Sequence, residues 1–558
     1  MKKTGAEIIT TLLQRQGVGT VAGIPGGCNL PLYDSLRESP IRHVLARHEQ
    51  GAGFIAQGMA RVTGRAGVCL ATSGPGATNL LTAIADARLD SVPLVAITGQ
   101  VPTPLIGSDA FQEVDTYGLT LPITKHNFFV RRPEELLEIV PAAFETAESG
   151  RPGPVCIDVP KDVQTCEAQI GRWPDPHRPQ PPAACDGSAV ASLAEMIRRS
   201  RRPVLYIGGG VITSGASEEL ALLARRNSIP VAATLAGLGA FPSDDPLSLG
   251  MLGMHGARST NMVLHEADLL LAIGVRFDDR ATGRAEDFCR HASIAHIDID
   301  PSEIDKIKPA NLSLVGDAGE VLRALLPAIP DDDRVEWRAR TRTLRSRYGP
   351  VPPPAGDPLH PRNFVRHLAR LAGPDAIVAT DVGQHQMWVA QEYPFRRPRS
   401  LLTSGGLGTM GFGLPAAIGA SLAKPGSRVV CVSGDGSFLM NIQELATLSE
   451  LGLDVTVAVM NNRHLGLVRQ QQELFYGGRT HASRFEAMPD FAAIARGFGI
   501  TGYDLEGDPD PMSTLETALS LPGPAVVNVP VHHAENVLPM VPPGGANDEM
   551  IWEEPSHA

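Results

Sequence analysis

Cysteine is scarce in this 558-residue sequence: the seven cysteines are odd in number, widely spread and free of any C-x-x-C pair. This usage excludes a disulfide framework and a cysteine-based zinc site, and it predicts reduced thiols in a cytoplasmic protein. Aromatic residues are also few, at 5% of the chain, which argues against a stacking surface for single-stranded nucleic acid.

The sequence also lacks a basic cluster and a long apolar run. Net charge is −12 with Lys and Arg scattered, so we expect no nucleic-acid partner, although local basic residues could hold a small anion. Glu7 and Arg15 interrupt the N-terminal region where a signal peptide needs apolar residues, and they predict an amphipathic helix. The longest charge-free run, 400–423, contains six glycines and a proline, which predicts a glycine-rich loop entering a helix rather than a membrane span. We expect a soluble protein that does not enter the membrane.

Two proline-rich stretches, 170–182 and 349–361, predict surface linkers, because proline continues neither helices nor central strands. They divide the chain into three predicted domains, 1–165, 188–340 and 360–540. Each alternates short Val- and Ile-rich runs with glycine turns and amphipathic stretches. This rhythm predicts an α/β fold of three doubly wound parallel sheets, which bind ligands beyond the carboxyl ends of their strands.

The third segment carries the strongest local motif. Gly434-Asp435-Gly436-Ser437 follows one predicted strand, and Asn461-Asn462 follows the next, 27 residues after Asp435. Neighbouring strand ends would bring a carboxylate and an amide oxygen to one point, and Mg²⁺ prefers such oxygen ligands alongside phosphate. The flanking glycines would let backbone N–H groups approach a diphosphate. Alone, GDGS could be a tight turn; with Asn462 at this spacing it predicts a thiamine diphosphate (ThDP) and Mg²⁺ site.

Glu49 opens a predicted helix of small residues in the first segment. It could be an acidic residue favoured by the helix dipole. In ThDP enzymes, however, a glutamate protonates the pyrimidine ring of the cofactor, and a low dielectric strengthens that hydrogen bond. Glu49 and Asp435 fall in different domains, which predicts a cofactor held between domains and between subunits.

The sequence resembles acetolactate synthase (acetohydroxyacid synthase) large subunits from end to end, and most closely the enterobacterial type with a very small regulatory subunit. The matching stretches are GIPGGCNLPLYDSL, RHEQGAGFIAQGMAR, SGPGATNLLTAIADARLDSVPLVAITGQV, IGSDAFQEVD, GRPGPVCIDVPKDV, GVRFDDR, DVGQHQMW, SGGLGTMGFGLPAAIG, GDGSFLMNIQEL, MNNRHLGLVRQQQELFY and PMVPPGGANDEM.

The resemblance implies that the chain joins two 2-keto acids, pyruvate with pyruvate or 2-ketobutyrate, in branched-chain amino acid biosynthesis. It implies ThDP, Mg²⁺ and a structural FAD as cofactors, a homodimer or tetramer, and a probable small regulatory subunit. The implied metal ligands are Asp435, Asn462 and the backbone carbonyl of His464. The implied ThDP contacts are Glu49, Gln384, His385, Gly408, Met410, Gly434, Asp435, Gly436, Ser437, Asn462, His464 and Gly466.

On the substrate side, the resemblance places Phe111, Gln112 and Lys161 in the channel and Gly27 beside the reactive carbon of the cofactor. Arg280 would bind the carboxylate of the second keto acid, because a guanidinium can form a bidentate pair of hydrogen bonds with a carboxylate. Its alternative is a surface ion pair with Asp278 or Asp279.

A GGG turn after a strand is weak evidence for a nucleotide, and aspartates at later strand ends could be ordinary helix caps. The resemblance favours FAD. The implied contacts are Arg151, Gly208, Gly209, Gly210, Thr234, Leu235, Met254, His255, Gly274, Arg276, Asp278, Asp298, Ile299 and Asp317.

One residue departs from the family. Many members carry a tryptophan where this chain has Gln471, and that tryptophan favours 2-ketobutyrate as second substrate. Loss of an aromatic wall weakens discrimination for one methylene, worth about 1–3 kcal/mol, so we expect little preference between acceptors.

Other functions stay open within the same cofactor class: pyruvate oxidase, a decarboxylase, glyoxylate carboligase or a flavin-free catabolic acetolactate synthase. Glu49 argues against glyoxylate carboligase, whose members lack it, and the RFDDR stretch argues against a flavin-free enzyme. A non-catalytic paralogue would usually have lost Glu49, Asp435 or Asn462, and all three are present.

Overall fold

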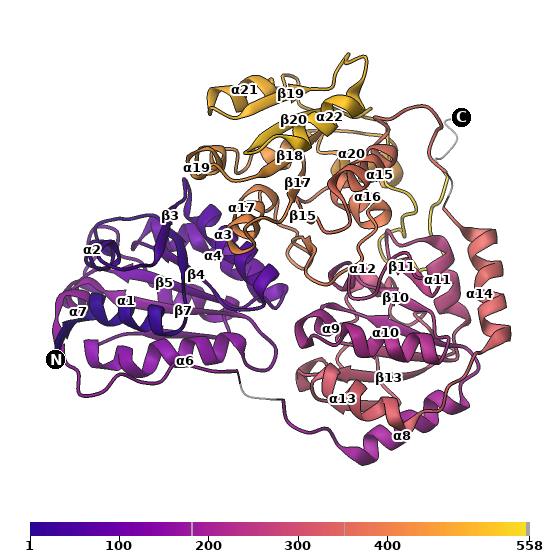
Figure 1. Cartoon of the computed structure of the whole chain (residues 1–558), viewed down its shortest axis with the longest axis horizontal. Coiled ribbons are helices and arrows are strands. Elements are labelled where there is room, and N and C mark those ends of the chain that lie inside the picture. Colours follow the sequence, from indigo (N-terminus) through magenta and orange to yellow (C-terminus); the bar gives the residue numbers. More distant parts are fainter. Residues whose placement is uncertain (180–181, 351, 554–558) are drawn as a thin grey trace.

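The computed structural model describes residues 1–179, 182–350 and 352–553, and it contains three α/β units, each built on a six-stranded parallel sheet (Figure 1). The expected fold class is confirmed. Both proline-rich stretches include residues outside the described part of the chain, 180–181 and 351. All seven cysteines are free thiols, as predicted.

The N-terminal sheet has the order β3-β2-β4-β5-β7-β6. In β4, Val68 and Leu70 join one apolar cluster while Cys69 and Ala71 join another, so both faces of the sheet are covered and the strand is apolar throughout. The strands are β2 (Thr20–Gly23), β3 (Arg42–Leu45), β4 (Gly67–Ala71), β5 (Leu94–Gln100), β6 (His126–Phe129) and β7 (Pro154–Pro160). The helices are α1 (Gly5–Arg15), α2 (Leu30–Arg37), α3 (Glu49–Thr63), α4 (Pro75–Leu89), α5 (Thr116–Thr120), α6 (Leu136–Glu148) and α7 (Lys161–Thr165), and β1 (Lys2–Thr4) pairs antiparallel with β8 (Glu167–Gln169).

The central sheet has the order β11-β10-β9-β12-β13-β14. Its strands are β9 (Pro203–Ile207), β10 (Val231–Ala233), β11 (Ser248–Met251), β12 (Leu269–Ile273), β13 (Ser293–Asp298) and β14 (Leu312–Val315). Its helices are α8 (Gly187–Arg199), α9 (Gly209–Ser214), α10 (Ser217–Arg226), α11 (Arg258–Glu266), α12 (Asp279–Thr282), α13 (Ala318–Leu325) and α14 (Val335–Tyr348).

The C-terminal sheet has the order β16-β15-β17-β18-β20-β19. Its strands are β15 (Ile377–Thr380), β16 (Leu401–Leu402), β17 (Val429–Gly434), β18 (Val455–Asn461), β19 (Thr501–Asp504) and β20 (Ala525–Pro530). Its helices are α15 (Pro361–Ala372), α16 (Gln384–Glu392), α17 (Gly413–Ala423), α18 (Asp435–Phe438), α19 (Glu444–Leu451), α20 (Gly466–Phe475), α21 (Phe491–Gly497) and α22 (Pro511–Ser520). The charge-free run 400–423 is a glycine-rich loop that enters α17, as predicted.

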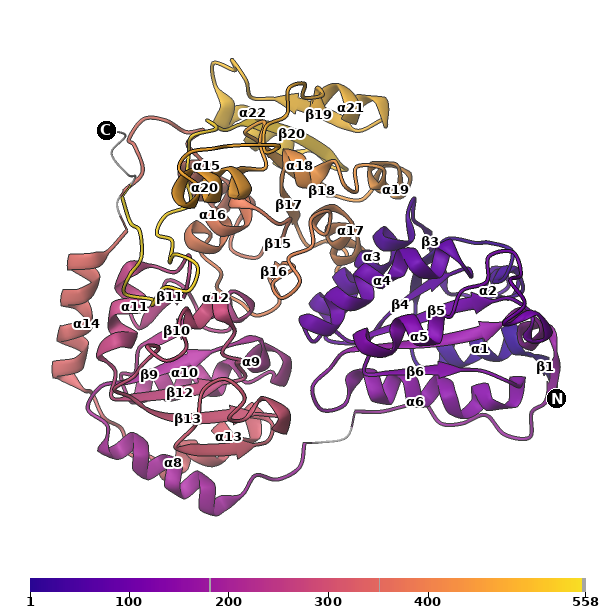
Figure 2. The ribbon, with the colours of Figure 1, turned by 180° about the vertical axis from the view of Figure 1, so that it is seen from behind.

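Helices α3 and α17 join the N- and C-terminal units along a seam of small residues, and the two helices lie side by side in both views (Figures 1 and 2). A Cβ on Gly58 would overlap the carbonyl oxygen of Ala416, and a Cβ on Gly419 would overlap that of Ile55. Because only glycine permits this approach, Gly58 and Gly419 set how closely α17 packs on the middle of α3, the helix that begins with Glu49.

The last described segment returns from the C-terminal unit to the central one. The backbone N–H of Val541 donates to Met254 (2.9 Å), and Gly283 forms an antiparallel bridge with Ala546. No helix in the described ranges is both long enough and apolar enough to span a membrane.

Candidate active site

A cavity of about 190 Å³ lies at the carboxyl ends of the C-terminal strands, where a doubly wound sheet binds its ligand. Four segments that follow β15, β16, β17 and β18 form its walls. The residues that line it are Val382, Gly383, Gln384, His385, Trp388, Gly408, Met410, Gly434, Asp435, Gly436, Ser437, Met460, Asn462, His464, Leu465, Gly466, Leu467 and Val468. Every residue expected to contact ThDP is therefore in this wall, except Glu49.

Asp435 and Asn462 converge as their spacing predicts, because β17 and β18 are parallel neighbours with Gly434 opposite Met460. Asp435 is buried, and its Oδ1 accepts from the N–H of Gly436 (2.8 Å). Its Oδ2 is buried without a hydrogen-bond partner among the residues that the structure describes. Burial raises the pKa of Asp435 to about 7. A buried carboxylate oxygen with no partner is costly, and a divalent cation would satisfy it.

Asn462 belongs to a polar chain that crosses the cavity floor. Its Nδ2 donates to Oε1 of Gln384 (3.1 Å), and its Oδ1 accepts from the N–H of His464 (3.0 Å). The Nε2 of Gln384 in turn donates to Oε1 of Gln470 (2.9 Å). These bonds fix Asn462 and His464, two of the three expected metal ligands, relative to each other.

The space beside this chain requires glycine. A Cβ on Gly466 would overlap Oε1 of Gln384, and a Cβ on Gly434 would lie 2.8 Å from Nδ1 of His385. His385 is buried, and burial lowers its pKa to about 3, so the ring is neutral. Within the described part of the chain its Nε2 has no hydrogen-bond partner, and it can serve a ligand in the cavity.

Glu49 is the first residue of α3 and is half-buried. The N-cap is His48, whose ring nitrogen accepts from the N–H of Gln50, so Glu49 is not needed to cap the helix. Oε2 of Glu49 accepts from Nδ2 of Asn79 in α4 (2.9 Å). The cavity of the same chain does not include Glu49 in its wall.

The start of α3 is held by a buried glutamate of the C-terminal unit. Oε1 of Glu444 accepts from the backbone N–H groups of Arg47 (2.9 Å) and His48 (3.1 Å). Burial raises the pKa of Glu444. Glu444 could not be identified from the sequence, because no local pattern links it to Arg47 and His48, which lie 397 and 396 positions away.

The expected substrate residues lie on the N-terminal unit. Phe111 is 87% exposed and Gly27 is exposed, while Gln112 and Lys161 are half-buried. Gln112 has a φ of +60°, and its backbone packs against Gly74, the residue that precedes α4. This places Gln112 at the same helix start as Gly76, where an added Cβ would lie 3.4 Å from Glu49 Oε1.

The expected FAD residues of the central unit all follow the carboxyl ends of its strands. Gly208, Gly209 and Gly210 follow β9; Thr234 and Leu235 follow β10; Met254 and His255 follow β11; Gly274, Arg276 and Asp278 follow β12; Asp298 and Ile299 end β13; and Asp317 follows β14. The backbones of Gly208 and Gly210 lie against that of Gly274, and an added Cβ on either would collide with it, so the turns after β9 and β12 pack directly on each other.

Several charged residues of the FAD set have protein partners. Asp317 caps α13 and Asp278 caps α12. Arg151, from the N-terminal unit, forms ion pairs with Asp300 (3.2 Å) and Glu303 (2.6 Å) of the central unit. The ordinary cap and ion-pair roles expected as alternatives are thus present.

Arg280 is exposed, with Nε 3.8 Å from Oδ2 of Asp279 and Nη1 3.2 Å from the sulfur of Met254. The surface ion pair considered as its alternative is present within the single chain. Gln471 is half-buried in α20, one turn beyond Leu467 and Val468 of the cavity wall.

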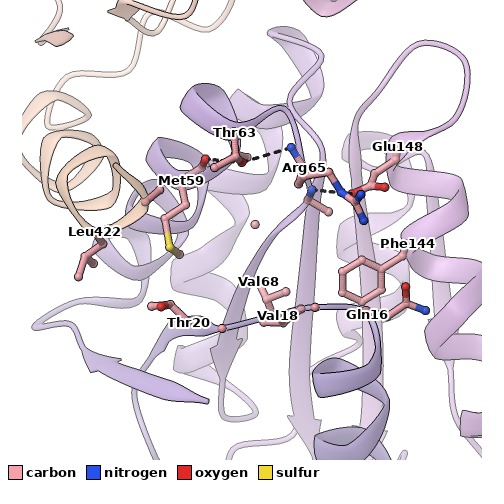
Figure 3. Close-up of a pocket in the computed structure, with 16 residues that line it drawn as sticks. Gln16, Val18, Thr20, Met59, Thr63, Arg65, Val68, Phe144, Glu148 and Leu422 are labelled. Carbon is pink, nitrogen blue, oxygen red and sulfur yellow. Dashed lines mark hydrogen bonds and ion pairs between the residues drawn. The ribbon is translucent and has the colours of Figure 1, made fainter. Parts of the chain in front are cut away.

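A second cavity, of about 420 Å³, lies in the N-terminal unit, at the amino ends of β2 and β4 (Figure 3). Its wall includes Met59, Phe144 and Leu422, and Arg65 donates to Glu148 there (3.0 Å). None of the expected site residues lines this cavity. It is at the amino ends of the strands, away from the edge that binds ligands in this fold.

Comparison with known proteins matches three family models along the chain. They are "Thiamine pyrophosphate enzyme, N-terminal TPP binding domain" at residues 3–119, "Thiamine pyrophosphate enzyme, central domain" at 190–325 and "Thiamine pyrophosphate enzyme, C-terminal TPP binding domain" at 381–529. Among curated proteins, the acetolactate synthase isozyme 1 large subunit of Escherichia coli K12 is 54% identical over 99% of this chain and 98% of its own length. The chain belongs to the acetolactate synthase large-subunit family.

Two further acetolactate synthases support this membership. The isozyme 2 large subunit of E. coli is 45% identical over 98% of this chain and 99% of its own, and the chloroplastic enzyme of Arabidopsis thaliana is 45% identical over 99% and 85%. The chain is therefore an enzyme, a ThDP-dependent acetolactate synthase of branched-chain amino acid synthesis. The family models fall within the predicted limits 1–165, 188–340 and 360–540, and those limits stay a prediction.

Proposed function

We propose that this acetolactate synthase binds ThDP in the C-terminal cavity with Mg²⁺ held by Asp435, Asn462 and the carbonyl of His464. The observation that carries the proposal is the buried, unpartnered Oδ2 of Asp435 beside the fixed amide of Asn462. One carboxylate and neutral oxygens suit Mg²⁺, which takes the rest of its octahedron from phosphate and water. The neutral, unpartnered Nε2 of His385 is suited to a diphosphate oxygen.

When bound, ThDP supplies an electron sink for decarboxylation of a 2-keto acid and for transfer of the remaining two-carbon unit. Glu49 holds a proton for the pyrimidine ring, and Asn79 fixes its carboxylate. Gly27, Phe111, Gln112 and Lys161 line the approach for pyruvate and shield the reacting centre from water. Gly408 and Met410 face the same cavity and support the pyrimidine.

The active site requires two copies of the chain in this proposal, which supports a homodimer. Glu49 does not line the cavity formed by its own chain, although α3 and α17 pack tightly. A partner copy would bring its own Glu49 to the cavity. A C2-symmetric pair would then contain two equivalent sites.

Mixing two inactive variants tests this arrangement. A hybrid of Glu49→Gln and Asp435→Ala chains contains one intact site if each site draws Glu49 from one chain and Asp435 from the other. Random exchange of subunits then restores about a quarter of wild-type acetolactate formation. If both residues acted within one chain, every site of the hybrid would be inactive and mixing would restore no acetolactate formation. Each variant alone is the control.

The acceptor is pyruvate or 2-ketobutyrate, and Arg280 binds its carboxylate, for which an exposed guanidinium beside one aspartate remains available. FAD occupies the carboxyl edge of the central sheet as a structural cofactor, supported by the glycine turn Gly208–Gly210 at the carboxyl end of β9, where a doubly wound sheet binds its ligand. Because the relatives are named large subunits, we extend the proposal to a small regulatory subunit. We also propose a cytoplasmic location.

A further inference from the structure

The loop Ser404–Gly411 brings Gly408 and Met410 to the cofactor cavity, and carboxylates at both ends hold it in place. At its C-terminal end, Oδ1 of the buried Asp381 accepts from the N–H of Gly411 (2.8 Å). At its N-terminal end the carboxylates come from another unit, on α4. Figure 2 shows α4 beside α3, which packs against α17, the helix that the loop enters.

Asp90 holds the backbone of this loop directly. Its Oδ1 accepts from the N–H of Gly406 (2.7 Å), and its Oδ2 accepts from the N–H of Gly405 (3.0 Å). Each carboxylate oxygen thus takes one consecutive N–H. Charge-assisted bonds of this kind are stronger than bonds between neutral groups.

Asp86, one turn earlier on α4, holds the loop side chains. Its Oδ2 accepts from Oγ of Ser404 and from Oγ1 of Thr409 (3.0 Å). Oγ of Ser404 also accepts from the N–H of Thr409 (2.8 Å), so the two ends of the turn are tied together. Asp86 is completely buried, and burial together with Asp90 raises its pKa.

Arg61 of α3 supplies the counter-charge. One of its nitrogens donates to Asp86 Oδ1 (3.2 Å) and Asp90 Oδ2 (2.8 Å), and the guanidinium lies 4.9 Å from the centre of the Phe412 ring. One guanidinium faces two carboxylates, so the remaining negative charge is stabilised by hydrogen bonds from the N–H and O–H groups of the loop. Without the loop, two buried acids would share one partner.

The position of Asp90 indicates that its carboxylate serves to hold the loop and does not stabilise α4. It is the C-cap of α4, where the helix dipole disfavours a negative charge. Replacement by asparagine would relieve that repulsion and keep the shape. It would also replace one of the two accepting oxygens by an amide NH₂ group. That group is a donor and cannot accept from a loop N–H, so one of the two hydrogen bonds to the loop would be lost.

We propose that Asp86 and Asp90 are positioning residues that hold the loop Ser404–Gly411, and with it Gly408 and Met410, in the conformation that binds ThDP. The inference rests on the proposed function, because it takes the C-terminal cavity as the cofactor site. Neither residue touches that cavity; both act through the loop.

The test measures ThDP binding, with Mg²⁺ present, by the fluorescence of the chain, since Trp388 lies in the cavity wall and reports binding without turnover. We expect Asp90→Asn to raise the Kd for ThDP about tenfold or more, with a thermal midpoint close to that of the wild type. Ser404→Ala, which leaves α4 intact, should weaken binding in the same direction and serves if Asp90→Asn does not fold.

Asp268→Asn is the matched control. Asp268 lies in the central unit and accepts from the N–H groups of Arg201 and Arg202 (both 2.9 Å) and from Ser200, a donor set like that of Asp90. We expect it to leave the Kd unchanged. Equal weakening in Asp268→Asn, or a Kd within about twofold of wild type in Asp90→Asn, would overturn the proposal.

Asp435→Ala separates the two levels of the argument. It should abolish binding, because it removes a proposed metal ligand. If it bound ThDP normally, the cofactor site itself would be misassigned and both proposals would fall. If Asp435→Ala lost binding while Asp90→Asn kept wild-type affinity, only the positioning role would be lost.

Discussion

Oε2 of Glu49 accepts a 2.9 Å hydrogen bond from Nδ2 of Asn79. The two residues begin or lie near the start of neighbouring helices, α3 and α4, whose packing is set by small residues. The bond leaves Oε1 of Glu49 available while it fixes the direction of the carboxylate. Proton transfer to a cofactor depends on that direction as much as on acidity.

Glu49→Gln should lower kcat at least about 100-fold, because the amide cannot give up a proton to the pyrimidine ring. Steady-state acetolactate formation with saturating ThDP measures the loss. Flavin absorbance and thermal midpoint should stay unchanged, since Glu49 caps nothing and contacts no central residue. Activity within a few-fold of wild type would remove Glu49 from the mechanism.

Asn79→Ala should lower kcat by about tenfold, less than loss of Glu49 itself, because the carboxylate remains but is no longer held. The KM for pyruvate should change little. Asn79→Asp is the sharper companion: it places a second carboxylate against Glu49 and should cost more than the alanine variant. Equal rates for both variants and wild type would show that the bond has no part in turnover.

Gln471→Trp should shift the enzyme toward 2-ketobutyrate as acceptor by about tenfold or more, because it restores an aromatic wall on the helix that borders the cavity. Products formed from equal concentrations of pyruvate and 2-ketobutyrate give the ratio. The wild-type ratio should be near one. Gln471→Leu controls for loss of the amide, and a strong wild-type bias toward the larger product would contradict the role assigned to Gln471.

His255 predicts a loss of stability on mild acidification. Its ring is buried beside the carbonyl oxygen of Pro539 (3.2 Å), and burial lowers its pKa from the ordinary 6.5 to about 4. Between these values the unfolded chain binds a proton at His255 that the folded chain does not, so the contribution of His255 to the free energy of unfolding falls as the pH is lowered from 6.5 toward 4. The fall is about 1.4 kcal/mol for each pH unit between the two pKa values.

Urea unfolding of the apoprotein at pH 7 and pH 5 measures this dependence. His255→Asn should flatten it relative to wild type, whereas His126→Asn, at an exposed position, should not. Parallel pH dependence in wild type and His255→Asn would contradict the assignment.

The pattern of strands and the convergence of Asp435 with Asn462 could be predicted from the sequence because both depend on short-range order. Continuous apolar runs marked β4 and β17 as strands covered on both faces, and the spacing of Asp435 and Asn462 corresponds to adjacent parallel strands. The strand ends then placed a carboxylate and an amide together without any knowledge of the rest of the chain.

The supporting contacts could not be predicted, because they join residues hundreds of positions apart. Ser404 meets Asp86 across 318 positions, and His48 meets Glu444 across 396. Nothing local distinguishes these acids from solvated ones. The role of Arg280 stays a prediction: its proposed carboxylate partner is a substrate outside the chain, and within the chain it pairs with Asp279.

The most direct test of the account is acetolactate formation from pyruvate by the purified chain, with ThDP, Mg²⁺ and FAD each omitted in turn. We expect product to disappear without any one of them, and no oxygen to be consumed, because the proposed role of the flavin is structural. Acetaldehyde release, flavin reduction or oxygen uptake in place of acetolactate would contradict the account and reassign the chemistry to a decarboxylase or an oxidase.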